Sequence, residues 1–263
     1  MEATPVADNA GVRAAAGLGG RVCIVTGASR TLGAAIASAL ARCGAAVAVN
    51  YNASEEAARK LCDRIAEAGG RAVPIQADVT EPGDIPRLIQ ETVAALGPVD
   101  ILVNNVGPYV DTPFLDLATP HFHHVLSGNL RPTFALSQIL GRSMKERGGG
   151  RIINIAATDA FHRSHSIYGL AKQAVLNLTE AMALDLAPEV TVNAIAPDLI
   201  ADNEDMSEEL VATATAATPM ARLITRAEIA DMACLICGPV FANVTGQTVV
   251  MDGGRSIRRM AGA

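Results

Sequence analysis

The sequence predicts a single open α/β domain, built on a doubly wound parallel sheet with helices on both faces. Short apolar runs alternate with helix-length segments along the 263 residues. The runs are continuously apolar instead of alternating with polar residues, which is typical of parallel strands that are covered on both faces. Neither an internal repeat nor a long linker divides the chain, so one domain is expected.

The apolar runs give the predicted strands in order. They cover residues 21–26, 45–49, 72–77, 99–103, 151–155, 190–195 and 247–251. The first run leads through a glycine turn into a predicted helix over 32–42. A second helix is predicted over 54–68, because Ser54 is a favourable N-cap residue and Gly69-Gly70 ends the pattern. Residues 1–20 are rich in Ala and Gly and are expected to form a flexible extension, which leaves 21–263 as the folded domain.

Composition excludes several classes of function. The chain has 21 Lys and Arg against 27 Asp and Glu, a net charge of −6, so neither a nucleic acid nor an anionic membrane is expected as a partner. No apolar run approaches the roughly 18 residues of a spanning helix. The first 20 residues lack the basic start and apolar stretch of a secretory signal. We therefore expect a cytoplasmic protein that acts on a small molecule.

The cysteines do not indicate a disulfide or metal framework. Their number, five, is odd. Cys234 and Cys237 are spaced as in a CxxC motif, but no second pair accompanies them and the surrounding Met-Ala-Cys-Leu-Ile-Cys stretch is apolar. We expect both thiols in the core, and no metal site.

A glycine turn follows the first predicted strand and leads into the first predicted helix. It runs Thr26-Gly27-Ala28-Ser29-Arg30-Thr31-Leu32-Gly33. Free backbone N–H groups and the positive end of a helix dipole suit such a turn to bind phosphate. Ligands of open parallel sheets bind beyond the carboxyl ends of the strands, so the residues that follow each strand are candidates for the site.

With further motifs, this turn makes the chain resemble the short-chain dehydrogenase/reductase family over about residues 20–254. The further motifs are Asp78-Val79, Asn104-Asn105-Val106-Gly107, Asn129, Tyr168-x-x-x-Lys172 and Met251-Asp252-Gly253-Gly254. The resemblance implies a single Rossmann-type domain that binds a nicotinamide dinucleotide and assembles as a homotetramer or homodimer.

The resemblance also assigns the cofactor-binding positions. They are Gly27, Ser29, Arg30, Thr31, Leu32, Gly33, Asn50, Tyr51, Asp78, Val79, Asn105, Gly107, Tyr168, Lys172, Pro197 and Leu199. Thr31 departs from the family pattern, which usually has glycine there, and restricts the backbone next to the pyrophosphate. We interpret Thr31 as a variation, because relatives such as pteridine reductases carry a large residue at this position and bind NADPH.

The end of the second strand predicts which dinucleotide binds. NAD-binding sheets usually end this strand with Asp or Glu, whereas here the strand ends Val49-Asn50-Tyr51-Asn52. A 2′-phosphate is repelled by a carboxylate and attracted by a guanidinium. Arg30 lies in the glycine turn, where NADP-type members of the family place a basic residue. The sequence therefore predicts NADP(H) as the cofactor.

Tyr168 and Lys172 are the predicted catalytic pair. They lie four residues apart at the start of a predicted helix, so their side chains share one face. A phenol has an ordinary pKa of about 10, and a nearby ammonium is expected to lower it toward the range of efficient proton transfer. The resemblance assigns Tyr168 as the proton donor, Lys172 as the partner of the ribose and of Tyr168, and Asn129 to a water-linked proton relay.

The serine that binds the substrate carbonyl in this family is missing. Thirteen residues before Tyr168 the chain has Ile155, and aligning the strand ends places Ala157 at the serine position, with the loop two residues shorter. Residues that could replace the serine all follow in the loop: Thr158, Asp159, Ser164 and Ser166. His162 and His165 lie in the same loop and are either pocket residues or merely exposed.

The segment after Pro197, where the family has its mobile substrate lid, is acidic. It contains Asp198, Asp202, Glu204, Asp205, Glu208 and Glu209, with no Lys or Arg before Arg222. Such a lid would attract a cationic amine and repel a carboxylate. Alternatively, the carboxylates are solvated groups near a helix start.

Together these observations predict an NADPH-dependent reductase that transfers hydride to a C=O bond of a small molecule. Two alternatives remain open. The missing serine and the acidic lid favour an imine or iminium reductase acting on a cationic amine. The missing serine and Thr31 favour a non-catalytic NADP(H)-binding regulatory protein.

Overall fold

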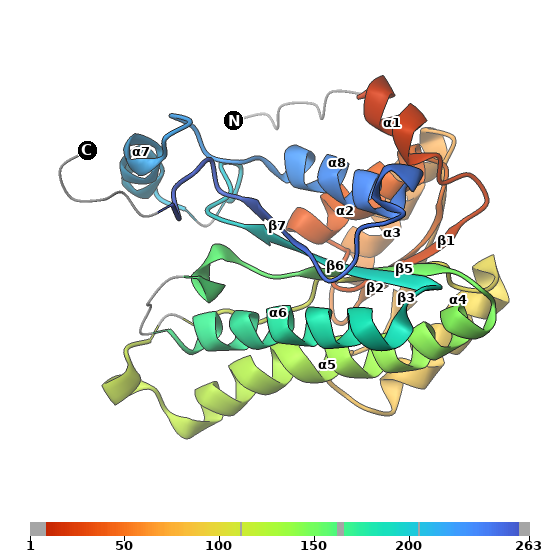
Figure 1. Cartoon of the computed structure of the whole chain (residues 1–263), viewed down its shortest axis with the longest axis horizontal. Helices are drawn as coiled ribbons and strands as arrows, with labels where there is room; N and C mark the ends of the chain where they lie inside the picture. The colour runs from red at the N-terminus through yellow and green to blue at the C-terminus, as the bar shows by residue number, and fades with distance from the viewer. Residues whose placement is uncertain (1–8, 111, 162–165, 205, 258–263) are drawn as a thin grey trace.

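One seven-stranded sheet forms the centre of the fold (Figure 1). The computed structural model describes residues 9–110, 112–161, 166–204 and 206–257. The strand order is β3-β2-β1-β4-β5-β6-β7, and every pairing is parallel. The strands are β1 (Val22–Val25), β2 (Ala46–Tyr51), β3 (Arg71–Gln76), β4 (Ile101–Asn104), β5 (Gly150–Ile155), β6 (Val190–Pro197) and β7 (Thr248–Met251). The predicted doubly wound sheet is confirmed, and no strand end is displaced by more than two residues.

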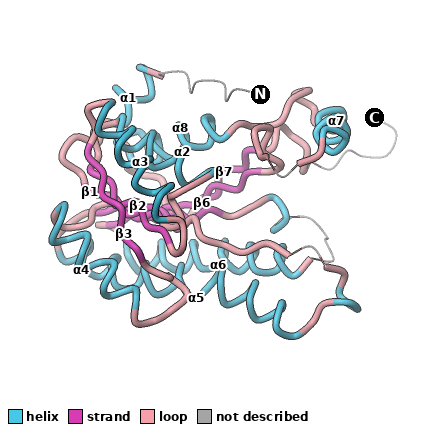
Figure 2. The backbone as a smooth tube through the Cα atoms, turned by 180° about the vertical axis from the view of Figure 1, so that it is seen from behind, coloured by secondary structure: helices cyan, strands magenta, loops and turns pink. Residues whose placement is uncertain are grey.

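Helices cover both faces of the sheet (Figure 2). One face carries α1 (Ala10–Ala16), α2 (Thr31–Arg42), α3 (Glu55–Glu67) and α8 (Arg226–Cys237), and the other carries α4 (Asp84–Leu96), α5 (Thr119–Glu146) and α6 (Ile167–Leu186). Successive residues of a strand point to opposite faces. In β1, Cys23 and Val25 therefore join the first core cluster, and Ile24 joins the second.

Smaller elements complete the two edges of the sheet. Beyond the carboxyl edge lies α7 (Glu208–Ala217), which follows β6 (Figure 1). Three short 3₁₀ turns are η1 (Phe114–Asp116), η2 (Thr158–Ala160) and η3 (Pro239–Phe241). Cys234 and Cys237 lie buried on α8 as free thiols, which confirms the core interpretation. None of the helices within the described ranges has the length and apolarity needed to cross a bilayer.

The N-terminal residues differ from the expectation. Residues 10–16 form α1, which packs against α8, and Asn9 caps it by accepting a hydrogen bond from the Val12 N–H (3.3 Å). Ala16 and Leu18 are buried. Alanine favours helix, and a Cβ on Gly238 would lie 2.8 Å from Ala16 Cα, so small residues permit the close approach. The expected flexible extension is therefore wrong for residues 9–20, while residues 1–8 lie outside the described ranges.

This packing makes a stability prediction. Leu18→Ala should lower the free energy of unfolding by about 2–4 kcal/mol, because Leu18 is only 2% exposed and its truncation leaves a cavity. Leu115→Ala is the matched control, since Leu115 is 91% exposed and should change stability by less than about 0.5 kcal/mol. Denaturant unfolding of both variants measures the difference. Equal stability of the two variants would show that the segment does not pack on the domain.

Candidate functional site

The carboxyl ends of β1 and β4 meet where the strand order reverses. There Thr26 Oγ1 accepts hydrogen bonds from the backbone N–H groups of Asn105 (2.9 Å) and Val106 (3.1 Å). Asn105 Nδ2 in return donates to the Thr26 carbonyl (2.9 Å). These bonds hold the turn after β1 against the turn after β4. The two turns form the walls of the crevice at which doubly wound sheets bind their ligands.

The glycine turn lies directly on this crevice. Gly27 has a φ of +60°, and its N–H donates to Asn50 Oδ1 (3.1 Å). A Cβ on Gly33 would lie 2.8 Å from Asn105 Nδ2 and would collide with the Gly27 carbonyl oxygen. Only glycine at these two positions lets the N-terminus of α2 come this close to the turn, the arrangement that suits phosphate binding.

Thr31 keeps the backbone conformation that glycine favours. Its φ is +49°, in the left-handed region, at a cost of about 1–2 kcal/mol for a residue with a side chain. The turn therefore has the same shape despite the substitution, and the threonine side chain is added beside the crevice.

A hollow of about 1060 Å³ opens beside the glycine turn. Its lining includes the predicted cofactor residues Gly27, Ser29, Arg30, Thr31 and Tyr51. Arg30 and Arg64 both line it, and in the described part of the chain neither forms an ion pair. Asp202 and Glu204 also line the hollow, but Glu204 is paired with Arg226, so the two guanidinium groups beside the glycine turn still favour an anionic ligand there.

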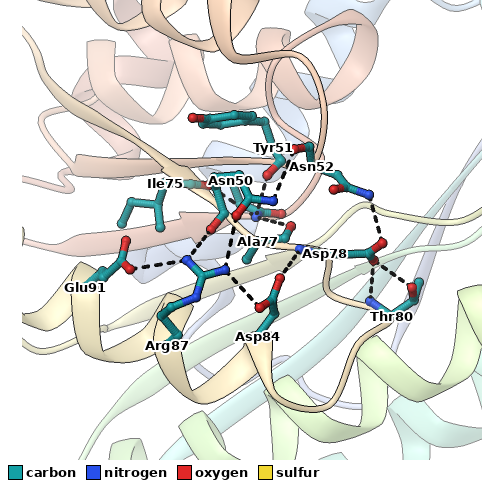
Figure 3. A network of polar contacts seen from close by, with 11 residues as sticks. Asn50, Tyr51, Asn52, Ile75, Ala77, Asp78, Thr80, Asp84, Arg87 and Glu91 are labelled. Atoms are coloured by element: carbon teal, nitrogen blue, oxygen red, sulfur yellow. Dashed lines mark hydrogen bonds and ion pairs between the residues drawn. The ribbon is translucent and has the colours of Figure 1, made fainter.

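The Asn50 side chain links the end of β2 to the end of β3, as Figure 3 shows. Its side chain is buried, and Nδ2 donates to the carbonyl groups of Ala77 (3.0 Å) and Ile75 (3.4 Å). The Tyr51 ring points away from this network, and Asn52 Nδ2 donates to Asp78 Oδ2 (2.8 Å). Asn50 thus acts on the backbone, whereas Tyr51 and Asn52 line the hollow.

Lys172 lies beside Tyr168 on one side and, with Asn129, against Gly107 on the other. Lys172 Nζ lies 5.3 Å from the centre of the Tyr168 ring and donates to the Ile155 carbonyl (2.8 Å). Asn129 Nδ2 donates to the carbonyl groups of Pro108 and Val125, and its buried Oδ1 has no hydrogen-bond partner among the described residues. A Cβ on Gly107 would lie 2.8 Å from Lys172 Nζ and would collide with Asn129 Oδ1. Asn129 and Lys172 can both pack against residue 107 only because it has no side chain.

Buried hydrogen bonds fix the two helices that carry these side chains. Asn104 Nδ2, at the end of β4, donates to Ser137 Oγ on α5 (3.0 Å) and to Asn154 Oδ1 on β5 (2.9 Å). Asn154 Nδ2 donates to Thr179 Oγ1 on α6 (2.8 Å). Ser166 caps α6 by accepting from the Tyr168 N–H (3.1 Å). The start of α6, and with it Tyr168, is held at the sheet edge.

Burial dominates the acid–base chemistry of the pair. Desolvation, followed by the nearby Asp159 and Tyr109, raises the pKa of Tyr168 above its ordinary value. Desolvation lowers the pKa of Lys172 to about 8, with Asp159 acting in the opposite direction. The predicted lowering of the Tyr168 pKa by Lys172 is therefore wrong for this structure. Tyr168 stays protonated at neutral pH, which is the state that a proton donor needs.

Comparison with known proteins identifies the family. The family model described as enoyl-(acyl carrier protein) reductase matches residues 27–256. A hydroxynaphthalene reductase-like protein of Metarhizium guizhouense is 34% identical over 256 residues, covering 90% of this chain and 95% of that protein. The chain belongs to the short-chain dehydrogenase/reductase family.

Solved structures of this family share the fold. A 7 alpha-hydroxysteroid dehydrogenase complexed with NADH and 7-oxo glycochenodeoxycholic acid has a TM-score of 0.87 at 32% identity, covering 91% of this chain and 96% of that one. A gluconate 5-dehydrogenase of Burkholderia cenocepacia, in complex with NADP and tartrate, has a TM-score of 0.87 at 30% identity, covering 94% and 99%. These relatives are reductases and dehydrogenases by name, and the chain is an oxidoreductase of the same family.

Ala157, the residue predicted at the position of the family's carbonyl-binding serine, lies two residues after β5 and directly before η2. The neighbouring hydroxyls are engaged elsewhere: Thr158 Oγ1 donates to Asp198 Oδ1 (2.9 Å), and Ser166 Oγ donates to the Val110 carbonyl (3.3 Å). Asp159 acts electrostatically on Tyr168 and on Lys172, so it lies near the pair. Ser164, His162 and His165 lie outside the described residues.

Two of the lid carboxylates, Asp198 and Glu204, form ion pairs with arginines that the sequence prediction did not name. Asp198 Oδ2 accepts a hydrogen bond from Arg255 Nη1 (2.9 Å), and the Arg226 guanidinium pairs with Glu204. The backbone N–H of Arg226 donates to Asp202 Oδ1 (3.0 Å). The expectation of a free acidic lid is therefore wrong for these three carboxylates. Their partners follow at least 22 residues later in the chain, beyond the reach of local pattern. Glu208 and Glu209 lie in the first turn of α7, and Asp205 lies outside the described residues.

Other predicted positions surround the crevice without facing the large hollow. Leu32, Val79 and Pro197 are buried, and Leu199 is half-buried after β6. Residues that the sequence reasoning missed include Asn52, Ser54 and Arg64 in the hollow, and Tyr109, whose ring meets that of Tyr168 edge-on at 5.0 Å. The sequence could have indicated them, because Asn52 and Ser54 follow closely after Tyr51, Tyr109 follows closely after Gly107, and Arg64 lies on α3.

The buried ammonium of Lys172 predicts a pH-dependent stability. Below about pH 8 the folded and unfolded chains both keep the proton, so the cost of burying the charge is complete. Between about 8 and 10.5 the unfolded chain holds a proton that the folded chain has lost, and the cost disappears. Relative to Lys172→Met, the wild type should therefore gain up to about 3 kcal/mol as pH rises through this window. Denaturant unfolding of both proteins from pH 7 to 10.5 measures it, and a constant difference would contradict the low pKa.

Proposed function

We propose that this protein is an NADP(H)-dependent reductase that transfers hydride to a C=O bond of a small molecule, with Tyr168 as the proton donor. The observation that carries the proposal is the placement of Lys172 beside the Tyr168 ring and, with Asn129, against Gly107 at the carboxyl edge of the sheet. A phenol held protonated by its surroundings fits the reductive direction, in which a proton must be given to the developing alkoxide.

The residues of the crevice fit a phosphorylated dinucleotide. Gly27 and Gly33 leave space that a side chain would fill, and Arg30 and Arg64 line the hollow without ion pairs among the described residues. The end of β2 carries Asn50 and Tyr51 and no carboxylate, so nothing there repels a 2′-phosphate. These features support NADP(H) over NAD(H). Solved relatives contain either cofactor, so the preference rests on this chain's own residues.

The chain's residues then have distinct tasks, while the bound dinucleotide supplies the hydride. Tyr168 donates its hydroxyl proton to the substrate oxygen. The Lys172 ammonium binds the ribose and stabilises the phenolate that remains. Asn129 Oδ1, which has no partner in the structure, accepts a hydrogen bond from a water molecule that carries the replacement proton toward Lys172.

The two alternatives have lost part of their support. The imine hypothesis drew on the acidic lid, and two of its carboxylates, Asp198 and Glu204, are paired with arginines. The non-catalytic hypothesis does not account for the presence of Tyr168, Lys172 and Asn129 together, in a chain whose relatives are named as reductases and dehydrogenases. A cytoplasmic location and a homodimer or homotetramer remain part of the proposal.

Tyr168→Phe tests the proton donor. The substitution removes only the hydroxyl, so turnover of NADPH with ketones should fall at least about a hundredfold while NADPH affinity changes little. The assay uses a panel of ketones with matched cyclic imines, followed by NADPH absorbance. Retention of more than about a tenth of the wild-type rate would show that another group delivers the proton. Faster turnover of the imines than of the ketones would overturn the carbonyl assignment.

Arg30→Ala tests the cofactor assignment. Loss of a charge-assisted contact to the 2′-phosphate should weaken NADPH binding at least about tenfold, and leave NADH binding within about twofold. The matched control is Arg42→Ala at the last turn of the same helix, away from the hollow, which should change neither affinity. Fluorescence titration with both cofactors gives the constants. An equal loss for NADPH and NADH would place Arg30 on another part of the dinucleotide.

A further inference from the structure

A second polar cavity lies at the amino end of the sheet, opposite the catalytic edge. It has a volume of about 290 Å³ and is enclosed between the starts of β4, β5 and β6. Arg151 and Thr191 are register partners on β5 and β6, so both side chains lie on the same face of the sheet. Glu189, just before β6, and Arg21 and Asp100, before β1 and β4, complete the polar lining.

Unsatisfied polar atoms concentrate in this cavity. In the described part of the chain, five buried side-chain polar atoms have no hydrogen-bond partner, and three of them belong here: Arg151 Nε, Glu189 Oε2 and Thr191 Oγ1. Thr191 is only 7% exposed. Each such atom costs about 1–3 kcal/mol if nothing binds it, and it is rare for three to share one cavity by chance. Two of these atoms can donate a hydrogen bond, and the third can only accept.

The charges around the cavity favour an anion. Asp100 is shared by Arg21 (3.7 Å) and Arg147 (3.8 Å), and Glu189 Oε2 lies 3.8 Å from Lys145 Nζ. Arg151 forms no ion pair with any residue in the described ranges, and Nη1 donates to the Gly150 carbonyl (2.9 Å). Arg147 and Lys145 do not line the cavity themselves, but their contacts counter the charges of its two carboxylates, and the Arg151 guanidinium is left without a counter-charge among the described residues.

We propose that this cavity binds a small protonated oxyanion of the hydrogen-phosphate class. Its oxygens accept hydrogen bonds from Arg151 Nε and from the Thr191 hydroxyl, and its own O–H donates to Glu189 Oε2. A water molecule can make the same hydrogen bonds but leaves the Arg151 guanidinium without a counter-charge. The anion supplies both the hydrogen bonds and the counter-charge.

The acceptor Glu189 makes the site selective between anions of similar size. Phosphate keeps at least one proton at neutral pH and can donate to the carboxylate. Sulfate carries no proton at that pH, so its oxygens face the Glu189 carboxylate without a hydrogen bond and are repelled by it. A general ionic effect does not distinguish the two anions in this way.

The test is binding of inorganic phosphate and of sulfate to the full chain at pH 7 and constant ionic strength, by calorimetry and by the rise in melting temperature. Phosphate should bind saturably, at least about tenfold more tightly than sulfate. Glu189→Gln, which replaces the acceptor with an amide donor, should reduce that preference to less than about threefold. Thr191→Val and Arg151→Gln should each weaken phosphate binding about tenfold or more.

The cofactor hollow also attracts phosphate, so Arg30→Ala is the matched control. It should leave the phosphate preference over sulfate unchanged. Binding lost in Arg30→Ala but kept in Arg151→Gln would place the anion in the cofactor hollow and overturn the proposal. Equal effects of phosphate and sulfate in the wild type, or no saturable binding up to about 20 mM, would show that the cavity holds water only.

Discussion

Hydrogen bonds to one buried hydroxyl, that of Thr26, hold together the two turns on which both parts of the candidate site depend. The hydroxyl oxygen accepts two N–H groups from the turn after β4, and the side chain is 1% exposed, so water does not compete. On one side of this contact Gly27 begins the phosphate turn. On the other, Val106 leads to Gly107, against which Asn129 and Lys172 pack. The cofactor and catalytic regions are therefore positioned by the same few bonds.

The catalytic pair owes its properties to burial more than to mutual attraction. Desolvation acts in opposite directions on an acid and a base: it raises the pKa of the Tyr168 phenol and lowers that of the Lys172 ammonium. Asp159 adds to the first effect and opposes the second. Both shifts favour neutral side chains, and the resulting proton on Tyr168 suits reduction. The short contact from Lys172 to the Ile155 carbonyl holds the cation in place without involving Tyr168.

Among the described residues, buried polar atoms without a hydrogen-bond partner occur at both edges of the sheet. At the carboxyl edge, Asn129 Oδ1 faces Gly107 in the candidate site. At the amino edge, Arg151 and Thr191 lie near the starts of β5 and β6. A folded chain satisfies nearly all its buried polar groups, so the exceptions mark places where water or a ligand completes the structure. In the lid, by contrast, Asp198 and Glu204 are paired with arginines, so these two carboxylates have a structural role.

The sequence by itself determined the sheet, the glycine turn and the candidate catalytic residues. These depend on local features: continuous apolar runs, glycines where a Cβ would collide, and a four-residue spacing on one helix face. Tertiary structure alone decided the partners of the lid carboxylates, the packing of α1 against α8, the direction of the Tyr168 pKa and the role of Asn50. Each of these depends on groups that are distant in the chain, such as Arg226 and Arg255, or on the degree of burial. Charge pairing and desolvation act through space, and a local pattern carries no record of them.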